Sequence, residues 1–124
     1  MIKFLNLIIG GAAGTIARYL LAGLVYKFMG TSFPYGTLVV NVSGCFILGV
    51  LATLAEKKFM FNPDMRILLM IGFCGAFTTF STLIFESDSL VRNGQAIRAF
   101  TNIFVSVILG FILFRIGVLL GEII

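Results

Sequence analysis

Four long apolar segments constrain the fold of this sequence more than any other feature. They cover approximately residues 4–26, 37–55, 65–90 and 99–120, and each has the length of about 20 residues that a bilayer core requires. Inside hydrocarbon, a backbone satisfies its polar groups only as a helix or a closed barrel. The sequence therefore predicts an all-α membrane protein, with four transmembrane helices in one domain over residues 1–124.

The composition agrees with a bilayer as the surrounding medium. The chain is 60% hydrophobic and only 11% charged, whereas about a quarter of an average soluble sequence is charged. The first apolar segment is too long for a secretory signal, and more follow it. The nine Lys and Arg residues are scattered and there is no histidine, which disfavours nucleic-acid binding and most metal or general-base sites. We expect Cys45 and Cys74 to be packing residues.

The positive charges are nearly balanced between the two sides of the predicted membrane. One side holds Lys3, Lys57, Lys58 and Arg66, and the other holds Lys27, Arg92 and Arg98. Because an excess of Lys and Arg marks the cytoplasmic side, this distribution gives little bias. Two interpretations stay open: a small difference between loops sets one orientation, or the chain inserts both ways and pairs as an antiparallel dimer.

Small residues at helical spacing indicate close contacts between helices. Gly10 and Gly14 form a GxxxG pair in the first segment, and Ser106 and Gly110 form a similar pair in the fourth. Such pairs let two helix backbones approach closely in lipid. We interpret the glycines as packing residues rather than as pore residues. Asn62, followed by Pro63, is a helix-start signal before the third segment.

A polar cluster interrupts the third apolar segment at residues 72–82. It places two glycines and four hydroxyl groups where lipid-facing leucines are expected. Since hydrocarbon offers these groups no partner, they predict a functional lining or a broken helix. Gly72 and Gly75 favour a break near residues 75–80, which would free carbonyls to hold a cation. The hydroxyls of Ser81 and Thr82 could replace water around a small anion, and so could the ring edge of Phe80.

Polar residues also lie within the other predicted spans. Arg18 is deep in the first, where a central arginine costs about 2.5–3.5 kcal/mol on insertion scales. It either bonds backbone carbonyls or attracts anions. Asn41 shares a helix face with Thr37, and either lines a polar vestibule or bonds another helix. Glu86 bonds a neighbouring helix or lies among the headgroups. The fourth span carries a stripe formed by Asn102, Ser106 and Gly110.

Three of these patterns together resemble the Fluc (CrcB) family of fluoride channels. They are Gly36–Asn41 at the start of the second span, Gly72–Thr82 in the third, and Arg18 within Gly14–Arg18. With Glu86, the resemblance covers essentially the whole chain. It implies a fluoride-selective channel of the inner (plasma) membrane that lets fluoride leave the cytoplasm passively. It also implies an antiparallel, dual-topology homodimer with two pathways.

The resemblance further assigns residues to two sites. The carbonyls of Gly75 and Thr78 would hold a structural Na⁺ at the dimer centre. The implied ion pathway consists of Arg18, Asn41, Phe80, Ser81, Thr82, Glu86 and Ser106. Among these, Arg18 and Asn41 would lie at an aqueous vestibule, Phe80 would be the first of two pore-facing phenylalanines, and Glu86 would lie at the far end.

The sequence departs from the family pattern at two places. Leu83 stands where the second phenylalanine is expected, and Gly110 and Phe114 stand where hydroxyl groups are expected on the fourth helix. Three explanations for the missing phenylalanine stay open. One phenylalanine per pathway is enough, Phe77 or Phe85 replaces the second one, or one of the two pathways does not conduct. A heterodimer with a diverged partner is another possibility, although the balanced charges argue against it.

Other functional classes fit the sequence less well. A small dual-topology multidrug exporter needs a membrane-embedded acid to bind cations and protons, and the first span has Arg18 but no Asp or Glu. A non-transporting scaffold would not need four hydroxyls within five positions. An enzyme is not expected, because no acid, base and nucleophile converge.

Overall fold

The computed structural model describes all 124 residues, as helices joined by short turns and without a strand. Four helical stretches are long and apolar enough to cross a membrane: α1 (Ile2–Met29), α2 (Tyr35–Glu56), a composite third stretch (Pro63–Arg92) and α6 (Ala96–Ile123). Each is slightly longer than the apolar segment that predicts it. The predicted all-α fold with four spans is therefore confirmed.

The third span is broken, and the break lies within the predicted interval. It consists of α3 (Pro63–Arg66), the π-helix η1 (Ile67–Cys74), α4 (Gly75–Phe77) and α5 (Phe80–Arg92). Thr78 and Thr79, between α4 and α5, are extended, with φ −86°, ψ 155° and φ −151°, ψ 112°. The backbone therefore leaves the helix for two residues and then starts a new one.

The prediction that glycines cause the break is wrong. Gly75 keeps helical angles, with φ −62° and ψ −36°. Gly72 is buried within η1, where its Cα lies against the Gly10 backbone of α1. Gly72 thus gives α1 room to approach, and the conformational freedom of glycine is not used at this position.

The ends of the elements follow local sequence signals. Asn62 precedes α3, and its side chain accepts a hydrogen bond of 2.8 Å from the Met65 N–H, with Pro63 at the first helical position. This is the expected N-cap arrangement. Gly30 follows α1 with a φ of 82°, and Gly94 lies in the turn after α5 with a φ of 74°. Glycine enters this region of positive φ without steric cost.

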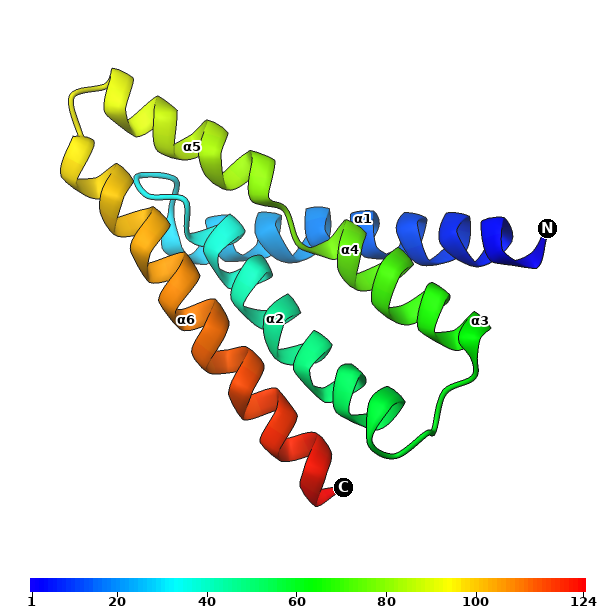
Figure 1. The fold of residues 1–124 in the computed structure, drawn as a ribbon. Helices are drawn as coiled ribbons and strands as arrows, with labels where there is room; N and C mark the ends of the chain where they lie inside the picture. Colours follow the sequence, from blue (N-terminus) through cyan, green and yellow to red (C-terminus); the bar gives the residue numbers. More distant parts are fainter.

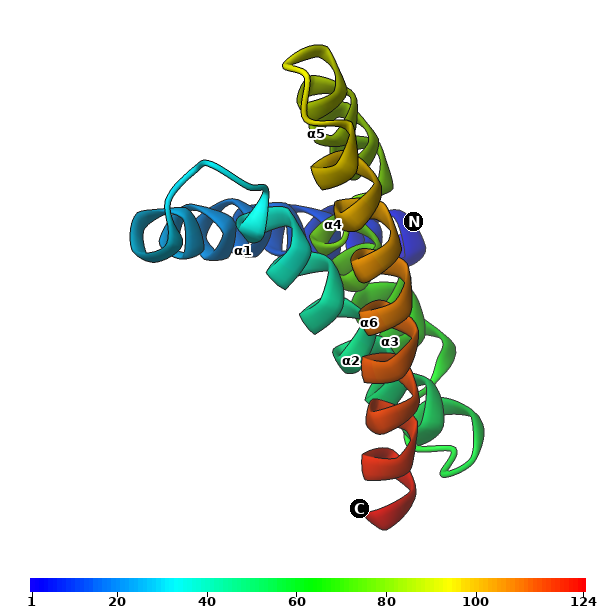
Figure 2. The ribbon, with the colours of Figure 1, turned by 90° about the vertical axis from the view of Figure 1, so that its left-hand side faces the viewer.

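The helices do not form a simple parallel bundle. α2 packs along α6, whereas α1 packs along η1 and α4, and α5 packs against the beginning of α6. Figure 1 shows α5 and α6 as a hairpin, with α2 between α6 and the first half of the third span. Figure 2 shows α1 running at a wide angle away from α2 and α6. The break at Thr78–Thr79 lies where these two groups of helices meet.

Glycines provide the closest contacts between helices. A Cβ atom on Gly10 or Gly14 would overlap the carbonyl oxygen of Leu68 or Phe73, respectively. The same holds between α2 and α6, where Gly49 lies against the Phe114 carbonyl and Gly117 against the Phe46 carbonyl. Small residues allow backbones to touch in this way. The packing interpretation of Gly10 and Gly14 is confirmed.

The single chain has a small core and a large apolar surface. Only 23 of its 124 residues are buried, and many Ile, Leu and Phe side chains on all four spans are exposed. Water would not tolerate apolar patches on this scale in a monomer. Lipid, or lipid together with a second copy of the chain, must therefore cover this surface.

The contact between α1 and η1 gives a test of the fold. Gly14→Ala should lower the free energy of unfolding by about 1–3 kcal/mol, because the new methyl group has no room against the Phe73 carbonyl. Gly11→Ala is the matched control, since nothing lies within 4 Å of a Cβ at Gly11; it should leave the stability unchanged or raise it by up to about 1 kcal/mol through helix propensity. Unfolding of the purified protein in mixed micelles measures both, and equal stabilities would contradict this packing.

Candidate functional site

One amide side chain satisfies both backbone groups of a residue in the break. The Asn41 Nδ2 donates to the Thr79 carbonyl at 3.0 Å, and the Thr79 N–H donates to the Asn41 Oδ1 at 2.7 Å. Asn41 therefore holds the extended residue of the third span against α2. Of the two interpretations of Asn41, the structure shows the bond to another helix.

The break leaves the four backbone carbonyls of residues 75–78 without their helical partners, and those of Gly75 and Thr78 are two of them. In a continuous helix, the Gly75 carbonyl would accept from the Thr79 N–H, and the Thr78 carbonyl from the Thr82 N–H. The first N–H donates to Asn41 instead, and the second donates to the Thr79 hydroxyl at 3.3 Å. Gly75 and Thr78 are the two residues whose carbonyls the family resemblance implies as cation ligands.

The threonines of the break form a compact set of hydroxyl contacts. The Thr79 hydroxyl caps α5, donates to the Thr82 hydroxyl at 3.0 Å and lies 3.4 Å from the Ser81 hydroxyl. The Thr78 hydroxyl donates to the Cys74 carbonyl at 2.9 Å. These bonds satisfy polar groups that hydrocarbon would leave without partners.

A cavity of about 680 Å³ opens between α1, α2 and α5, and we call it the α1 cavity. Its polar lining consists mainly of Thr15, Arg18, Tyr26, Lys27, Thr37, Thr79, Thr82 and Glu86. Arg18 forms no hydrogen bond or ion pair within the chain. Its guanidinium therefore gives the cavity a positive charge that an anion could use.

Glu86 joins α5 to the other two walls of the α1 cavity. Its Oε1 accepts hydrogen bonds from the hydroxyls of Thr37 at 2.9 Å and Tyr26 at 3.3 Å. Its Oε2 is buried without a partner. The interpretation of Glu86 as an interhelical contact is confirmed. Sequence reasoning missed Tyr26, although its spacing of eight residues from Arg18 places both on one helix face.

A second cavity, of about 240 Å³, lies between α2, α5 and α6, and we call it the α6 cavity. The residues that line it include Asn41, Gly44, Cys45, Thr78, Thr79, Phe80, Leu83 and Ser106. The Ser106 hydroxyl is buried and has no hydrogen-bond partner. Thr79 lines both cavities, so the break lies between them.

The structure thus sorts the predicted site residues into two groups. Arg18, Thr82 and Glu86 line the α1 cavity, whereas Asn41, Phe80 and Ser106 line the α6 cavity. Ser81 is exposed beside the break and lines neither of them. The sequence did not predict that Thr79 lines both cavities, although Thr79 belongs to the polar cluster of residues 72–82.

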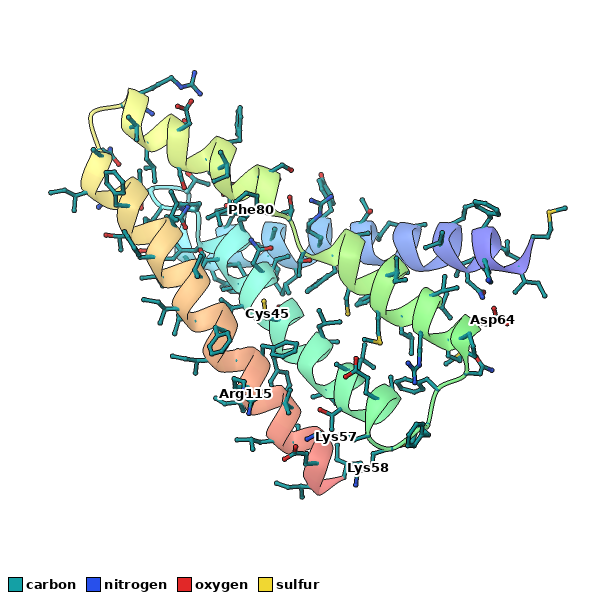
Figure 3. All side chains as sticks on the ribbon, viewed as in Figure 1. Cys45, Lys57, Lys58, Asp64, Phe80 and Arg115 are labelled. Atoms are coloured by element: carbon teal, nitrogen blue, oxygen red, sulfur yellow. The ribbon has the colours of Figure 1, made fainter.

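Two phenylalanines that the sequence places one helical turn apart are separated by the break. Phe77 is buried and stacks on Phe73 with ring centroids 5.6 Å apart. Phe80, at the start of α5, is 71% exposed and projects from the middle of the molecule (Figure 3). The two extended residues, Thr78 and Thr79, redirect the chain between these two phenylalanines. Leu83, where the family pattern has the second phenylalanine, is buried on α5 and lines the α6 cavity.

The fold and the site define a small polytopic membrane protein whose broken span lies between two cavities, each with some polar side chains in a largely apolar lining. The sequence matches the family described as "CrcB-like protein, Camphor Resistance (CrcB)" over residues 5–118. The chain belongs to the CrcB family.

Curated relatives extend the match over the whole chain. A protein of Desulforapulum autotrophicum is 44% identical over 122 residues, which is 98% of each chain. One of Maridesulfovibrio salexigens is 44% identical over 124 residues, 100% of this chain and 98% of its own. One of Dehalococcoides mccartyi is 43% identical over 120 residues, 97% of this chain and 92% of its own. Each is named "Fluoride-specific ion channel FluC".

The Asn41 contact generates a prediction about stability. Asn41→Leu keeps the side-chain size but leaves the Thr79 N–H and carbonyl without partners, so the free energy of unfolding should fall by about 1–3 kcal/mol. Ser43→Ala is the control, because the Ser43 hydroxyl bonds only the Val40 carbonyl of its own helix. Thermal unfolding in detergent measures both variants. An Asn41→Leu protein as stable as Ser43→Ala would show that the break does not depend on this amide.

Proposed function

We propose that this chain is a subunit of a fluoride-selective ion channel, which lets fluoride leave the cell passively across the plasma membrane and so lowers cytoplasmic fluoride. The observation that carries the proposal is the pair of cavities beside the broken span, each with hydrogen-bond donors in its lining, in a chain whose relatives are named as fluoride channels. Its four spans make it a multi-pass membrane protein.

The chemistry of the cavities suits a small, strongly hydrated anion. Fluoride gives up its water only if donors replace it along the path, because a bare buried charge is very costly. The α1 cavity offers Arg18 and the hydroxyl of Thr82, and the α6 cavity offers the free hydroxyl of Ser106. Phe80 adds a ring edge of partial positive charge at the mouth of the α6 cavity. Neutral donors bind the ion without trapping it.

We assign the remaining predicted residues to supporting positions. Ser81 lies exposed beside the break, where a second subunit could bring it into the path. Asn41 holds the break that separates the cavities, and Glu86 orders the α1–α2–α5 junction at the far end of the α1 cavity. Leu83 lacks an aromatic edge, so Phe80 alone supplies that contact in each pathway.

The proposed assembly is an antiparallel homodimer. The balanced charges give each orientation a similar insertion preference, and the large apolar surface leaves room for a partner. A heterodimer with a diverged chain is the alternative, but partners of fixed orientation require clearer charge bias. A multidrug exporter is disfavoured, since α1 has no acidic residue to bind a cation.

We propose that the carbonyls of Gly75 and Thr78 bind a structural Na⁺ at the dimer centre. Both carbonyls have lost their helical partners to Asn41 and to the Thr79 hydroxyl. Carbonyl oxygens freed by a helix break are suitable ligands for Na⁺. Gly75 is exposed, with open space where a side chain would be, so a second subunit could approach it.

A mutation of Phe80 tests the anion path. Phe80→Ile should lower fluoride efflux from liposomes at least tenfold, as measured with a fluoride electrode, because the aliphatic side chain has no positive edge. Phe85→Ile is the control: Phe85 is on the same helix and similarly exposed, at 67%, but lines neither cavity. It should conduct normally. Wild-type flux from a dimeric Phe80→Ile protein would contradict the role of Phe80, and absence of fluoride flux from the wild-type dimer would overturn the proposed function.

Replacement of the cation tests the Na⁺ site. Protein purified and reconstituted with N-methyl-D-glucamine as the only cation should lose fluoride efflux, because this cation is too large for two carbonyl oxygens at a helix break to surround. Returning Na⁺ should restore the efflux. Unchanged efflux after thorough exchange would contradict a structural Na⁺, while leaving the fluoride pathway itself in place.

A further inference from the structure

The donors of the α6 cavity are not equally free to bind a passing anion. The Thr78 hydroxyl donates to the Cys74 carbonyl, and the Thr79 hydroxyl donates to Thr82. The Asn41 amide donates to the Thr79 carbonyl. Two side chains in the lining have no hydrogen-bond partner: Ser106, which is 7% exposed, and Cys45.

Cys45 occupies a particular place beside the polar stripe of α6. The stripe consists of Asn102, Ser106 and Gly110, all buried, and it lacks a side chain at Gly110. The Cys45 sulfur, from α2, lies 3.3 Å from where a Gly110 Cβ would be. Figure 3 shows Cys45 on α2, near the start of α5 where Phe80 projects. The thiol therefore lies in close contact with the position that a residue-110 side chain would occupy.

We propose that the Cys45 thiol is a pathway-lining donor, which continues the α6 stripe past Ser106 in place of the side chain that Gly110 lacks. The inference rests on the proposed function. A thiol is a weak hydrogen-bond donor, and the buried Ser106, whose hydroxyl has no hydrogen-bond partner, lines the same cavity. An anion that leaves Ser106 meets the Cys45 S–H next.

Substitutions at Cys45 separate a donor from a mere filler of space. Cys45→Ser keeps a donor, so fluoride efflux should stay within about twofold of wild type. Cys45→Ala removes the donor but widens the cavity, and efflux should fall about fivefold, the factor that corresponds to one ordinary hydrogen bond. Gel filtration verifies that both variants remain dimers. An Ala variant that conducts as well as Ser, or better, would overturn the inference.

Chemical modification of Cys45 provides a second test of the same inference. The Cys45 sulfur should attack the sulfenyl sulfur of methyl methanethiosulfonate. A new disulfide forms to the S-methyl group, the reagent's own S–S bond breaks, methanesulfinate leaves, and the thiol proton passes to water. The added group should reduce efflux at least tenfold, because it fills a narrow cavity of about 240 Å³. Dithiothreitol should reverse the block.

The controls use the other cysteine. Cys74 is 2% exposed and does not line the α6 cavity, so Cys74→Ser should remain sensitive to the reagent, whereas Cys45→Ser should be resistant. Mass spectrometry identifies the labelled residue. Full labelling of Cys45 without loss of efflux, or an equally sensitive Cys45→Ser protein, would overturn this inference alone. Untreated wild-type protein that moves no fluoride would remove the proposed function and this inference together.

Discussion

The structure depends on the pair of hydrogen bonds between Asn41 and the backbone of Thr79. An interrupted helix inside hydrocarbon exposes an N–H and a carbonyl, each of which costs several kcal/mol if it stays without a partner. A primary amide has one donor and one acceptor side by side, so a single asparagine from α2 satisfies both groups of Thr79. These two bonds therefore lower the cost of interrupting the third span at Thr79.

Close packing around the break makes this geometry possible. α1 reaches the backbone of η1 only because Gly10 and Gly14 have no side chains, and α2 reaches α6 through Gly49 and Gly117. Because interiors are densely packed, these contacts fix where Asn41 lies relative to Thr79. The glycines of the first span thus support a polar contact with which they have no direct interaction.

The sequence predicts the four spans and the interval of the break well, because apolar length and intramembrane hydroxyls are strong signals. It does not predict the cause of the break. Glycine near a break suggests backbone freedom, but Gly75 stays helical and Gly72 packs against α1. The backbone at the break is instead bonded by an asparagine 38 residues earlier, and no local pattern shows that pairing. For the same reason Tyr26, which meets Glu86 from another helix, was not predicted.

One break in one helix creates sites of opposite polarity. Where α4 ends, carbonyls point out of the helix, and this negative end of the peptide dipoles suits a cation. Where α5 begins, free N–H groups and the Thr79 hydroxyl form the positive end, which suits an anion. Thr79 lines both cavities and is held by Asn41. Any movement of Thr79 would therefore act on the proposed cation ligands and on the proposed anion path together, so in the proposed channel a bound cation would serve to fix the geometry through which the anion passes.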